Sequence, residues 1–314
     1  MLVSASTPLL PTGEQFEISA DTDFGRAVVT ITEVAAALRA FTVDELDIVQ
    51  RYPLDAPPSL GAGIVMAPWP NRIDSGKWNY GGQKQQLAIT DTEFYNASHG
   101  LLTATPYAVA SRTDSSITLT ATIFAQAGYP FVIETAVTYS LTANGLETTH
   151  TLINRGSQPA PVAVGSHAYY KIGDVATSDL ILSNSAKTVY TNDARLLPNG
   201  SVDVFGDFDL REGRRVGDVT LDDCFTNQNV VDGRHRCRLT APDGRFVEVW
   251  TDESFSHTVL LTTRRFTDEN GDAILAVAIE PQTAAVNSLN NGIGFTWLEP
   301  GETWSVRWGV SANL

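Results

Sequence analysis

The sequence predicts an all-β fold, either a sandwich or a barrel. Apolar runs rich in β-branched residues recur along the 314-residue chain, and turns that contain glycine or proline separate them. Helical periodicity is almost absent. Because the chain has no linker-like change of composition and no repeat of fixed period, we expect residues 1–314 to form one large antiparallel domain.

The expected strands are short apolar runs, most of them in the segments 116–153 and 238–310. Residues 27–32 are short and β-branched, residues 116–124 alternate apolar and polar side chains, and 131–141 with 146–153 form a hairpin around Ala143-Asn144-Gly145. Further strands are expected at 238–240, 246–250, 258–262, 274–279 and 304–310. Residues 32–41 suit either a short helix or a strand with a loop.

The charge of the chain disfavours several classes of partner. Its formal net charge is −15, whereas nucleic acid and anionic membranes attract basic surfaces, so we expect neither as a partner. No apolar run approaches the roughly 20 residues that a membrane helix needs. Neutral ligands rich in hydroxyl groups remain compatible with this charge.

Cysteine content and the N-terminus indicate the cytoplasm. Cys224 and Cys237 are the two cysteines, and they fit neither a disulfide framework nor a zinc motif. Residues 1–14 lack the basic start and apolar core of a secretory signal. We therefore expect a cytoplasmic protein with reduced thiols.

Two polar stretches follow apolar runs and carry the strongest candidates for catalysis. Glu280 follows 274–279 and precedes Pro281, and His167 lies in the stretch 165–170 that follows 161–164. Proline cannot donate a hydrogen bond to a sheet, so we expect the strand to end at Glu280. Alternation places small residues on the same faces, where they leave room for a ligand. These are Ala163 and Gly165 beside His167, and Ala276 and Ala278 beside Glu280. Such a His and Glu suit paired proton transfer.

Other polar residues could bind a ligand, although each also has an ordinary structural interpretation. Arg72 follows Asn71 in a loop stiffened by two prolines, and its guanidinium could bind sugar oxygens or cap loop carbonyls. His99 lies in another loop and is weak evidence alone. Of Asp222 and Asp223, one could accept sugar hydroxyls while the other is solvated. The sequence lacks zinc, dinucleotide and P-loop motifs, so we expect no metal and no cofactor.

The order of these motifs resembles the aldose 1-epimerase (galactose mutarotase) family from about residue 71 to the C-terminus. The matching segments are Asn71-Arg72-Ile73, Gly76 to Gly82, His99-Gly100, Gly165 to Tyr170, Leu221 to Phe225, Ile279-Glu280-Pro281 and Leu298 to Glu302. The residues around His167 differ from the family's usual His-Pro-Tyr-Phe-Asn stretch.

The resemblance implies a large antiparallel β-sandwich of the galactose mutarotase type, with a monosaccharide cleft. Within it, Glu280 would be the general base and His167 the general acid. Arg72, His99 and Asp222, with Asn71 beside them, would hold the sugar. Asp222 is preferred over Asp223 because its spacing to Phe225 matches the family's Asp-x-x-Phe pattern.

The chemistry of anomer exchange fits a Glu and His pair. A base removes the proton of O1 while an acid protonates the ring oxygen O5. The ring opens, the C1–C2 bond rotates, and the ring closes on the other face of the carbonyl. Ordinary pKa values of about 4.3 for Glu and 6.5 for His make both groups usable near neutrality.

Three other functions remain open from the sequence. A glycosidase would need two carboxylates, and Glu280 with Asp222 is the pair available. A sugar-binding module without activity would need no matched acid and base. A sugar-phosphate epimerase would need several basic groups, whereas Arg72 alone lies near a motif.

Overall fold

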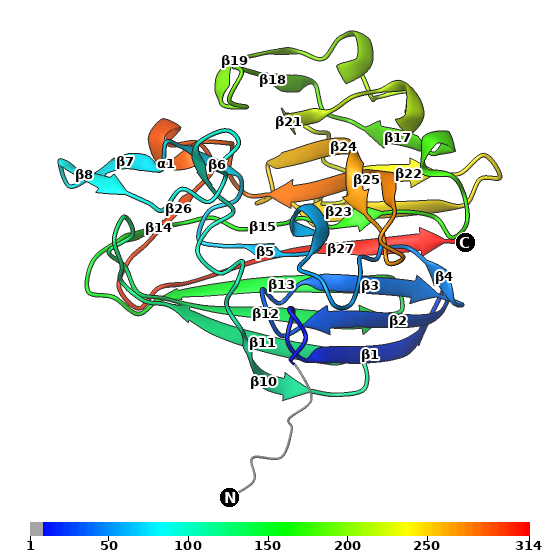
Figure 1. Ribbon diagram of the computed structural model, residues 1–314, viewed down its shortest axis with the longest axis horizontal. Coiled ribbons are helices and arrows are strands. Elements are labelled where there is room, and N and C mark those ends of the chain that lie inside the picture. Colours follow the sequence, from blue (N-terminus) through cyan, green and yellow to red (C-terminus); the bar gives the residue numbers. More distant parts are fainter. Residues whose placement is uncertain (1–8) are drawn as a thin grey trace, which may run out of the picture.

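Three antiparallel sheets form most of the protein (Figure 1). The computed structural model describes residues 9–314, so the first eight residues of the segment used to exclude a secretory signal lie outside it. A nine-stranded and an eight-stranded sheet are accompanied by a four-stranded sheet at the N-terminal end of the chain. The all-β class predicted from the sequence is confirmed.

Neighbouring strands in each sheet come from distant parts of the chain. In spatial order, the nine-stranded sheet contains β10 (Ala108–Arg112), β11 (Ser116–Ile123), β12 (Ile133–Thr142), β13 (Gly145–Asn154), β27 (Thr303–Asn313), β23 (Phe246–Asp252), β22 (Arg234–Thr240), β17 (Ile181–Asn184) and β20 (Arg214–Arg215). The eight-stranded sheet contains β19 (Pro198–Asp203), β18 (Thr188–Asn192), β21 (Asp222–Thr226), β24 (His257–Thr267), β25 (Ala273–Gln282), β15 (Gly165–Ser166) and β5 (Val65–Met66), with β16 (Tyr169–Tyr170) also paired to β25. The four-stranded sheet contains β1 (Gln15–Thr22), β2 (Gly25–Thr32), β3 (Leu38–Val43) and β4 (Leu46–Asp47).

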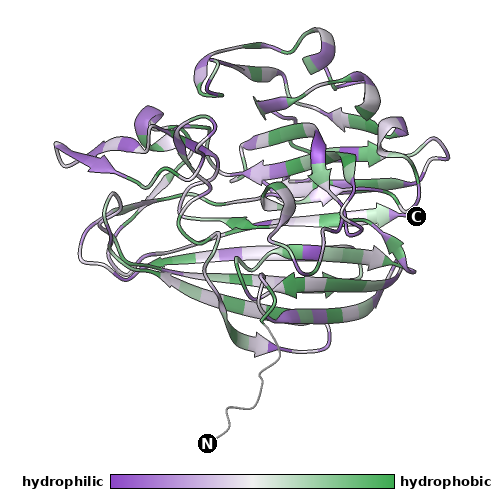
Figure 2. Cartoon of the chain, in the orientation of Figure 1, coloured by the Kyte–Doolittle hydropathy of each residue, from purple (hydrophilic) through white to green (hydrophobic). Residues whose placement is uncertain are grey.

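Short elements connect the large sheets. The two-stranded pairs are β14 (Ala160–Val162) with β26 (Thr296–Leu298), β6 (Arg72–Asp74) with β9 (Asn96–Ser98), and β7 (Lys77–Tyr80) with β8 (Gln83–Gln86). The helical turns are η1 (Ser59–Gly61), η2 (Thr177–Asp179), η3 (Gly206–Phe208), η4 (Val216–Asp218) and α1 (Ser288–Asn291). Hydrophilic residues dominate the projecting β7–β8 hairpin (Figure 2). None of the helices in residues 9–314 is long and apolar enough to cross a membrane.

Each strand expected from the sequence overlaps a strand of the structure, although others, such as β1 and β18, were not expected. The hairpin predicted around Asn144 is confirmed as β12 and β13, which pair from Thr142 and Gly145 outward. Residues 32–41 form a loop followed by β3, not a helix. Ala35 and Ala36 in that loop have positive φ angles of 63° and 46°, which interrupt regular structure.

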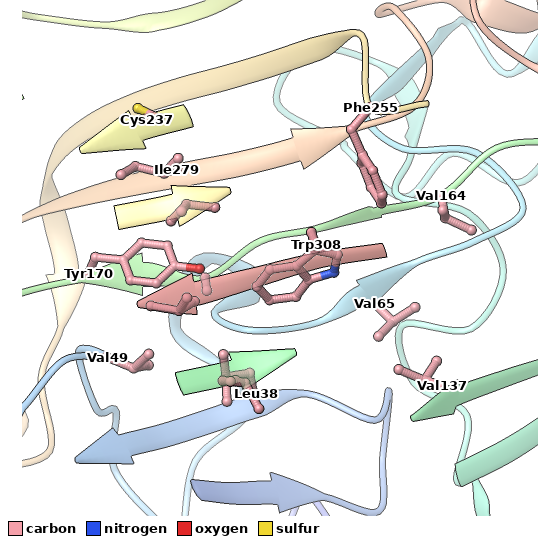
Figure 3. Close-up of a cluster of buried hydrophobic side chains, with 14 of the residues drawn as sticks. Leu38, Val49, Val65, Val137, Val164, Tyr170, Cys237, Phe255, Ile279 and Trp308 are labelled. Carbon is pink, nitrogen blue, oxygen red and sulfur yellow. The ribbon is translucent and has the colours of Figure 1, made fainter. Parts of the chain in front are cut away.

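One hydrophobic cluster joins the three large sheets. Figure 3 shows Trp308 of β27, Ile279 of β25 and Leu38 of β3 among the buried side chains that meet there. On β25, Val277 and Ile279 belong to this cluster, so alternation turns Glu280 to the opposite face of the sheet. The core therefore fixes the direction in which Glu280 points.

Strand β25 does not end at Glu280, contrary to the expectation from the following proline. It continues through Pro281 to Gln282, and Pro281 pairs with Thr258 of β24. The N–H groups of Ile279 and Thr283 are directed to Ala168 and Val164, so Pro281 faces the gap between β15 and β16. The proline is accommodated there because the missing N–H would have no regular strand partner.

Candidate active site

Glu280 and His167 are in direct contact. Oε1 of Glu280 lies 3.3 Å from Nε2 of His167, and the side chains are 2% and 6% exposed respectively. Glu280 lies on β25, and His167 directly follows β15, which pairs with β25. The fold thus brings together the two residues that sequence analysis assigned to proton transfer.

A neighbouring amide holds the carboxyl group of Glu280. Nε2 of Gln282, also on β25, donates a hydrogen bond of 3.0 Å to Oε2 of Glu280. Gln282 is fully buried, so the carboxyl group has little freedom to rotate. Burial, and next the negative charge of Asp222, raise the pKa of Glu280 to about 8.

Backbone hydrogen bonds fix the position of His167, and burial keeps its side chain neutral. Its N–H donates to the carbonyl of Ile64 at 3.2 Å, and its carbonyl accepts from the N–H of Gly63 at 2.9 Å. Nδ1 is buried with no hydrogen-bond partner among the described residues. Burial lowers the pKa of His167 to about 4.

The two groups together hold one exchangeable proton near neutral pH. The shifted pKa values place this proton on Glu280, whereas the roles implied by the family resemblance place it on His167. The two forms contain the same number of protons and differ by one transfer across the 3.3 Å contact. Coupled groups of this kind titrate as a pair, so either form is available to the reaction over the same pH range.

A cavity of about 450 Å³ opens above these residues. This volume lies within the range typical of small-molecule sites. It is lined by Leu60, Gly61, Ile64, Arg72, Thr90, Asp91, Glu93, Phe94, Ser98, His99, Thr103, His167, Tyr169, Asp222, Leu261, Thr263 and Arg265. Four predicted site residues thus share one cavity, and Glu280 lies next to its wall in contact with His167.

Arg72 is fixed between two acids. Its Nε donates to Oδ2 of Asp91 at 3.1 Å, and its Nη2 lies 3.7 Å from Oδ2 of Asp222. The guanidinium also lies 5.5 Å from the ring centroid of Phe94. Sequence analysis missed Asp91, because it belongs to no motif and its contact with Arg72 depends on how its loop packs against β6.

Asn71 lies behind the wall of the site. It is 3% exposed and is not among the residues that line the cavity. Its side-chain oxygen accepts from the backbone N–H of Arg72 at 2.8 Å, and its backbone carbonyl accepts from the N–H of His99 at 3.0 Å. Asn71 therefore positions Arg72 and His99, and its direct contact with a sugar stays a prediction.

His99 lies against His167. The two rings meet edge to face with centroids 5.2 Å apart. Burial, and next the positive charge that His167 carries when protonated and that of Arg72, hold the pKa of His99 well below its usual range. His99 is therefore a neutral hydrogen-bonding group near neutral pH, which suits contact with sugar hydroxyls.

The space above Ala276 and Ala278 is filled, contrary to expectation. These alanines pack in a buried cluster with Tyr169 and Phe266, because Tyr169 of β16 pairs directly opposite Ala278. The small residues therefore admit an aromatic ring, not a ligand. The hydroxyl of Tyr169 is buried without a partner among the described residues, and Tyr169 lines the cavity. Its position two residues after His167 could have indicated from the sequence that Tyr169 faces the same cavity.

Asp222 and Asp223 have different surroundings. Asp222 lines the cavity beside Arg72. The carboxyl group of Asp223 instead accepts hydrogen bonds from the backbone N–H of Asp222 at 3.0 Å and from Asn192 at 3.3 Å. Burial raises the pKa of Asp223. Asp223 is half-buried and bonded, not simply solvated.

Arg195 fastens the loop between β18 and β19 to the cavity wall. Its guanidinium donates to Oδ1 of Asp74 at 2.7 Å, to Oδ1 of Asn96 at 2.8 Å and to the carbonyl of Phe94 at 3.0 Å. These partners flank the segment that carries Asp91 and Phe94. Sequence analysis missed this clamp because its parts lie about a hundred residues apart, and no local pattern connects them.

The residues of the site do not form a metal centre. Over residues 9–314, no cluster of three or more His, Cys, Asp or Glu side chains has a geometry that could hold a metal ion. The site consists of proton-transfer groups and hydrogen-bonding groups from several loops.

The chain matches the aldose 1-epimerase family model over residues 18–311 and therefore belongs to that family. Family membership makes it an isomerase-type enzyme that acts on sugars. It is 28% identical over 286 residues to the uncharacterized protein YihR of Escherichia coli K12, and the match covers 87% of this chain and 86% of that protein.

Solved structures share the fold. The aldose epimerase homologue of Caenorhabditis elegans has a TM-score of 0.82 at 19% identity, with 95% of this chain and 99% of that chain covered. The galactose 1-epimerase of Lactobacillus acidophilus has a TM-score of 0.75 at 20% identity, covering 99% and 98% respectively. At such identities the likeness concerns the fold, which is that of the galactose mutarotases.

Proposed function

We propose that this protein is an aldose 1-epimerase that interconverts the α and β anomers of a hexose such as galactose or glucose. The single observation that carries the proposal is the buried contact of 3.3 Å between His167 and Glu280 beside a cavity of about 450 Å³. O1 and O5 of a pyranose are both bonded to C1, so an acid and a base in contact can reach both atoms of one sugar. We also propose that residues 1–314 act as one cytoplasmic domain.

Ring opening follows from the positions of the two groups. Glu280 accepts the proton of O1 while His167 donates a proton to O5, and the C1–O5 bond breaks. After rotation about C1–C2, the ring closes on the other carbonyl face and both protons return. The proton that burial places on Glu280 must first pass to His167 across their contact. The charge of Arg72 favours ionised Glu280 but disfavours protonated His167, so it acts on both sides of this transfer.

The remaining polar residues hold the sugar. Arg72 and Asp222 present donors and an acceptor on one side of the cavity, and His99 presents a neutral imidazole beside His167. The hydroxyl of Tyr169 adds another polar group in the wall. Neutral hydroxyl groups pair well with such a mixed set, because they both donate and accept hydrogen bonds.

The rival functions have less support. A glycosidase would use Glu280 with a second carboxylate across the bond, whereas Glu280 contacts an imidazole and is hydrogen-bonded to Gln282. A binding module without activity would bury an acid and a base together at a cost in stability and without use for either. The site geometry therefore favours catalysis of anomer exchange.

Polarimetry of freshly dissolved α-D-galactose and α-D-glucose tests the proposal. We expect the protein to accelerate the approach to anomeric equilibrium above the buffer rate for at least one of these sugars. The activity should persist after exhaustive EDTA treatment and dialysis, because the proposed steps use side chains of the chain itself. Folded protein that leaves the rate of both sugars at the buffer rate would contradict the proposal.

A further inference from the structure

Four arginines line a second cavity, which lies on the nine-stranded sheet, whereas Glu280 of the candidate active site belongs to the eight-stranded sheet. The cavity has a volume of about 240 Å³, and its lining includes Arg211, Arg234, Arg236 and Arg238. Its lining includes residues of β17, β22 and β23, which are neighbours in the nine-stranded sheet. It shares no lining residue with the cavity above His167.

The strand pattern turns these arginines outward. Cys237 and Leu239 of β22 pack in the hydrophobic core, so the alternating residues Arg234, Arg236 and Arg238 share the opposite face. Like charges placed next to each other on one sheet face repel. Three arginines on one strand face are therefore a costly arrangement, and they occur in a chain whose formal net charge is −15.

Neighbouring side chains hold the guanidinium groups in defined planes. Arg234 lies over the ring of Trp250 at 3.8 Å from its centroid, and Arg238 lies over Phe246 at 4.1 Å. Stacking of this kind orients a guanidinium while leaving its edge for hydrogen bonds. The donors are therefore arranged before any ligand arrives.

One buried carboxylate partly neutralises the cluster. Glu248 of β23 is 4% exposed and lies directly opposite Arg238. It accepts hydrogen bonds from Arg238 at 2.6 Å and from Arg236 at 2.7 Å. The cavity lining thus contains four guanidinium groups and one carboxylate, and it keeps a net positive charge.

Asp209 and Asp252 lie near the cluster but are engaged. Asp209 is paired with Arg211 through two hydrogen bonds of 2.7 Å. Asp252 stands opposite Arg234 in the strand register, and its carboxyl group accepts the backbone N–H groups of Ser254 and Arg307. Arg234 therefore brings its positive charge to the cavity without forming an ion pair with any acid of residues 9–314.

We propose that this cavity binds a phosphate group, either as inorganic phosphate or as a small phosphate monoester, at a site separate from the sugar cavity. Guanidinium forks match the oxygens of a phosphate better than they match a halide ion. Ser185 also lines the cavity, and its hydroxyl can donate while its oxygen accepts the N–H of Asn229. Residues of the lining come from three adjacent strands, which gives the site a rigid base.

Calorimetric titration with inorganic phosphate and with methyl phosphate tests the proposal at constant ionic strength. We expect saturable binding of one anion per chain, unaffected by saturating galactose. Arg234→Gln should weaken the binding by at least about 10-fold, since a charge-assisted hydrogen bond is lost. Arg211→Gln provides a second variant from a different element. Arg155→Gln is the matched control, because Arg155 is an exposed arginine paired with Glu134 outside this cavity.

The outcomes separate the alternatives. Tighter binding of methyl phosphate than of inorganic phosphate would assign the site to a monoester, and the reverse order would assign it to the free ion. Binding that galactose displaces, or that both arginine variants retain at full strength, would place the anion elsewhere and overturn the proposal. Absence of saturable binding up to about 20 mM phosphate would also overturn it.

Discussion

His167 and Glu280 meet through Nε2 and Oε1 at 3.3 Å, in a setting where each side chain is nearly inaccessible to water. Burial acts on the two groups in opposite directions, because it disfavours the charged form of each. The pair therefore carries one proton over a broad pH range. That shared proton is the property from which the expected behaviour of the enzyme follows.

The pH dependence of kcat/KM should follow the protonation of the His167 and Glu280 pair. The pKa of His167 is lowered to about 4 and that of Glu280 is raised to about 8, so the form with one proton prevails between these values. We expect kcat/KM to fall below pH 4, where the pair gains a second proton, and above pH 8, where it loses the last. Initial mutarotation rates from about pH 3 to 10, corrected for buffer catalysis, measure this.

His167→Asn is the matching variant. It should lose most of the rate and the alkaline limb, because Glu280 would then titrate alone and be needed in its ionised form. A variant that retains both the rate and the alkaline limb would mean that another group, for which His99 is the nearest candidate, is the acid.

Stability should depend on the same carboxyl group. Burial raises the pKa of Glu280 to about 8, so the folded state keeps a proton that the unfolded state releases above the ordinary pKa. The contribution of this proton to the free energy of unfolding is fully present below the ordinary pKa of Glu and is lost as the pH rises through 8. Glu280→Gln cannot ionise, and its Tm relative to the native protein should rise from pH 5 to pH 8. Calorimetry at both pH values measures this, with the exposed Glu269→Gln as control, and an unchanged difference would contradict it.

The ion pair between Asp91 and Arg72 should affect sugar binding. Asp91→Ala removes the acceptor 3.1 Å from Nε of Arg72, so the guanidinium loses its fixed direction. We expect KM to rise by about 10-fold with a smaller change in kcat, and Asp91→Asn should restore part of the loss. Asp223→Asn is the control because its carboxyl group bonds to Asn192 and the Asp222 backbone. An equal rise of KM in Asp91→Ala and Asp223→Asn would disprove the assigned role of Asp91.

Leu60 combines backbone strain with a place in the cavity wall. Its φ of 48° is unfavourable for a leucine, and it is 38% exposed. If Leu60 packs against the sugar, both Leu60→Gly and Leu60→Ala should raise KM several-fold. The glycine variant should also be more stable than the alanine variant, since glycine adopts positive φ without strain. Unchanged KM in both would show that the residue has no part in binding.

Local patterns predicted many of the strands and singled out polar residues that the structure brings to one cavity, but not the contacts between loops. The alternation around 144 and the apolar run before Glu280 depend on neighbouring residues, which a sequence displays directly. The pairing of Arg72 with Asp91 and the clamp of Arg195 on Asp74 join segments far apart in the chain. The prediction that the strand ends at Glu280 was wrong for the same reason. Pro281 fits inside β25 because of the path that β15 and β16 take beside it.

Exchange between anomers in Glu280→Gln is the most direct test of the central claim. Magnetisation-transfer NMR on the preferred sugar measures the exchange rate, and titration calorimetry measures sugar binding by the same folded variant. We expect exchange to fall at least about 100-fold while binding survives, because Gln keeps the shape of Glu280 but cannot accept the O1 proton. Near-native exchange by the folded variant would contradict the claim that Glu280 and His167 carry the reaction.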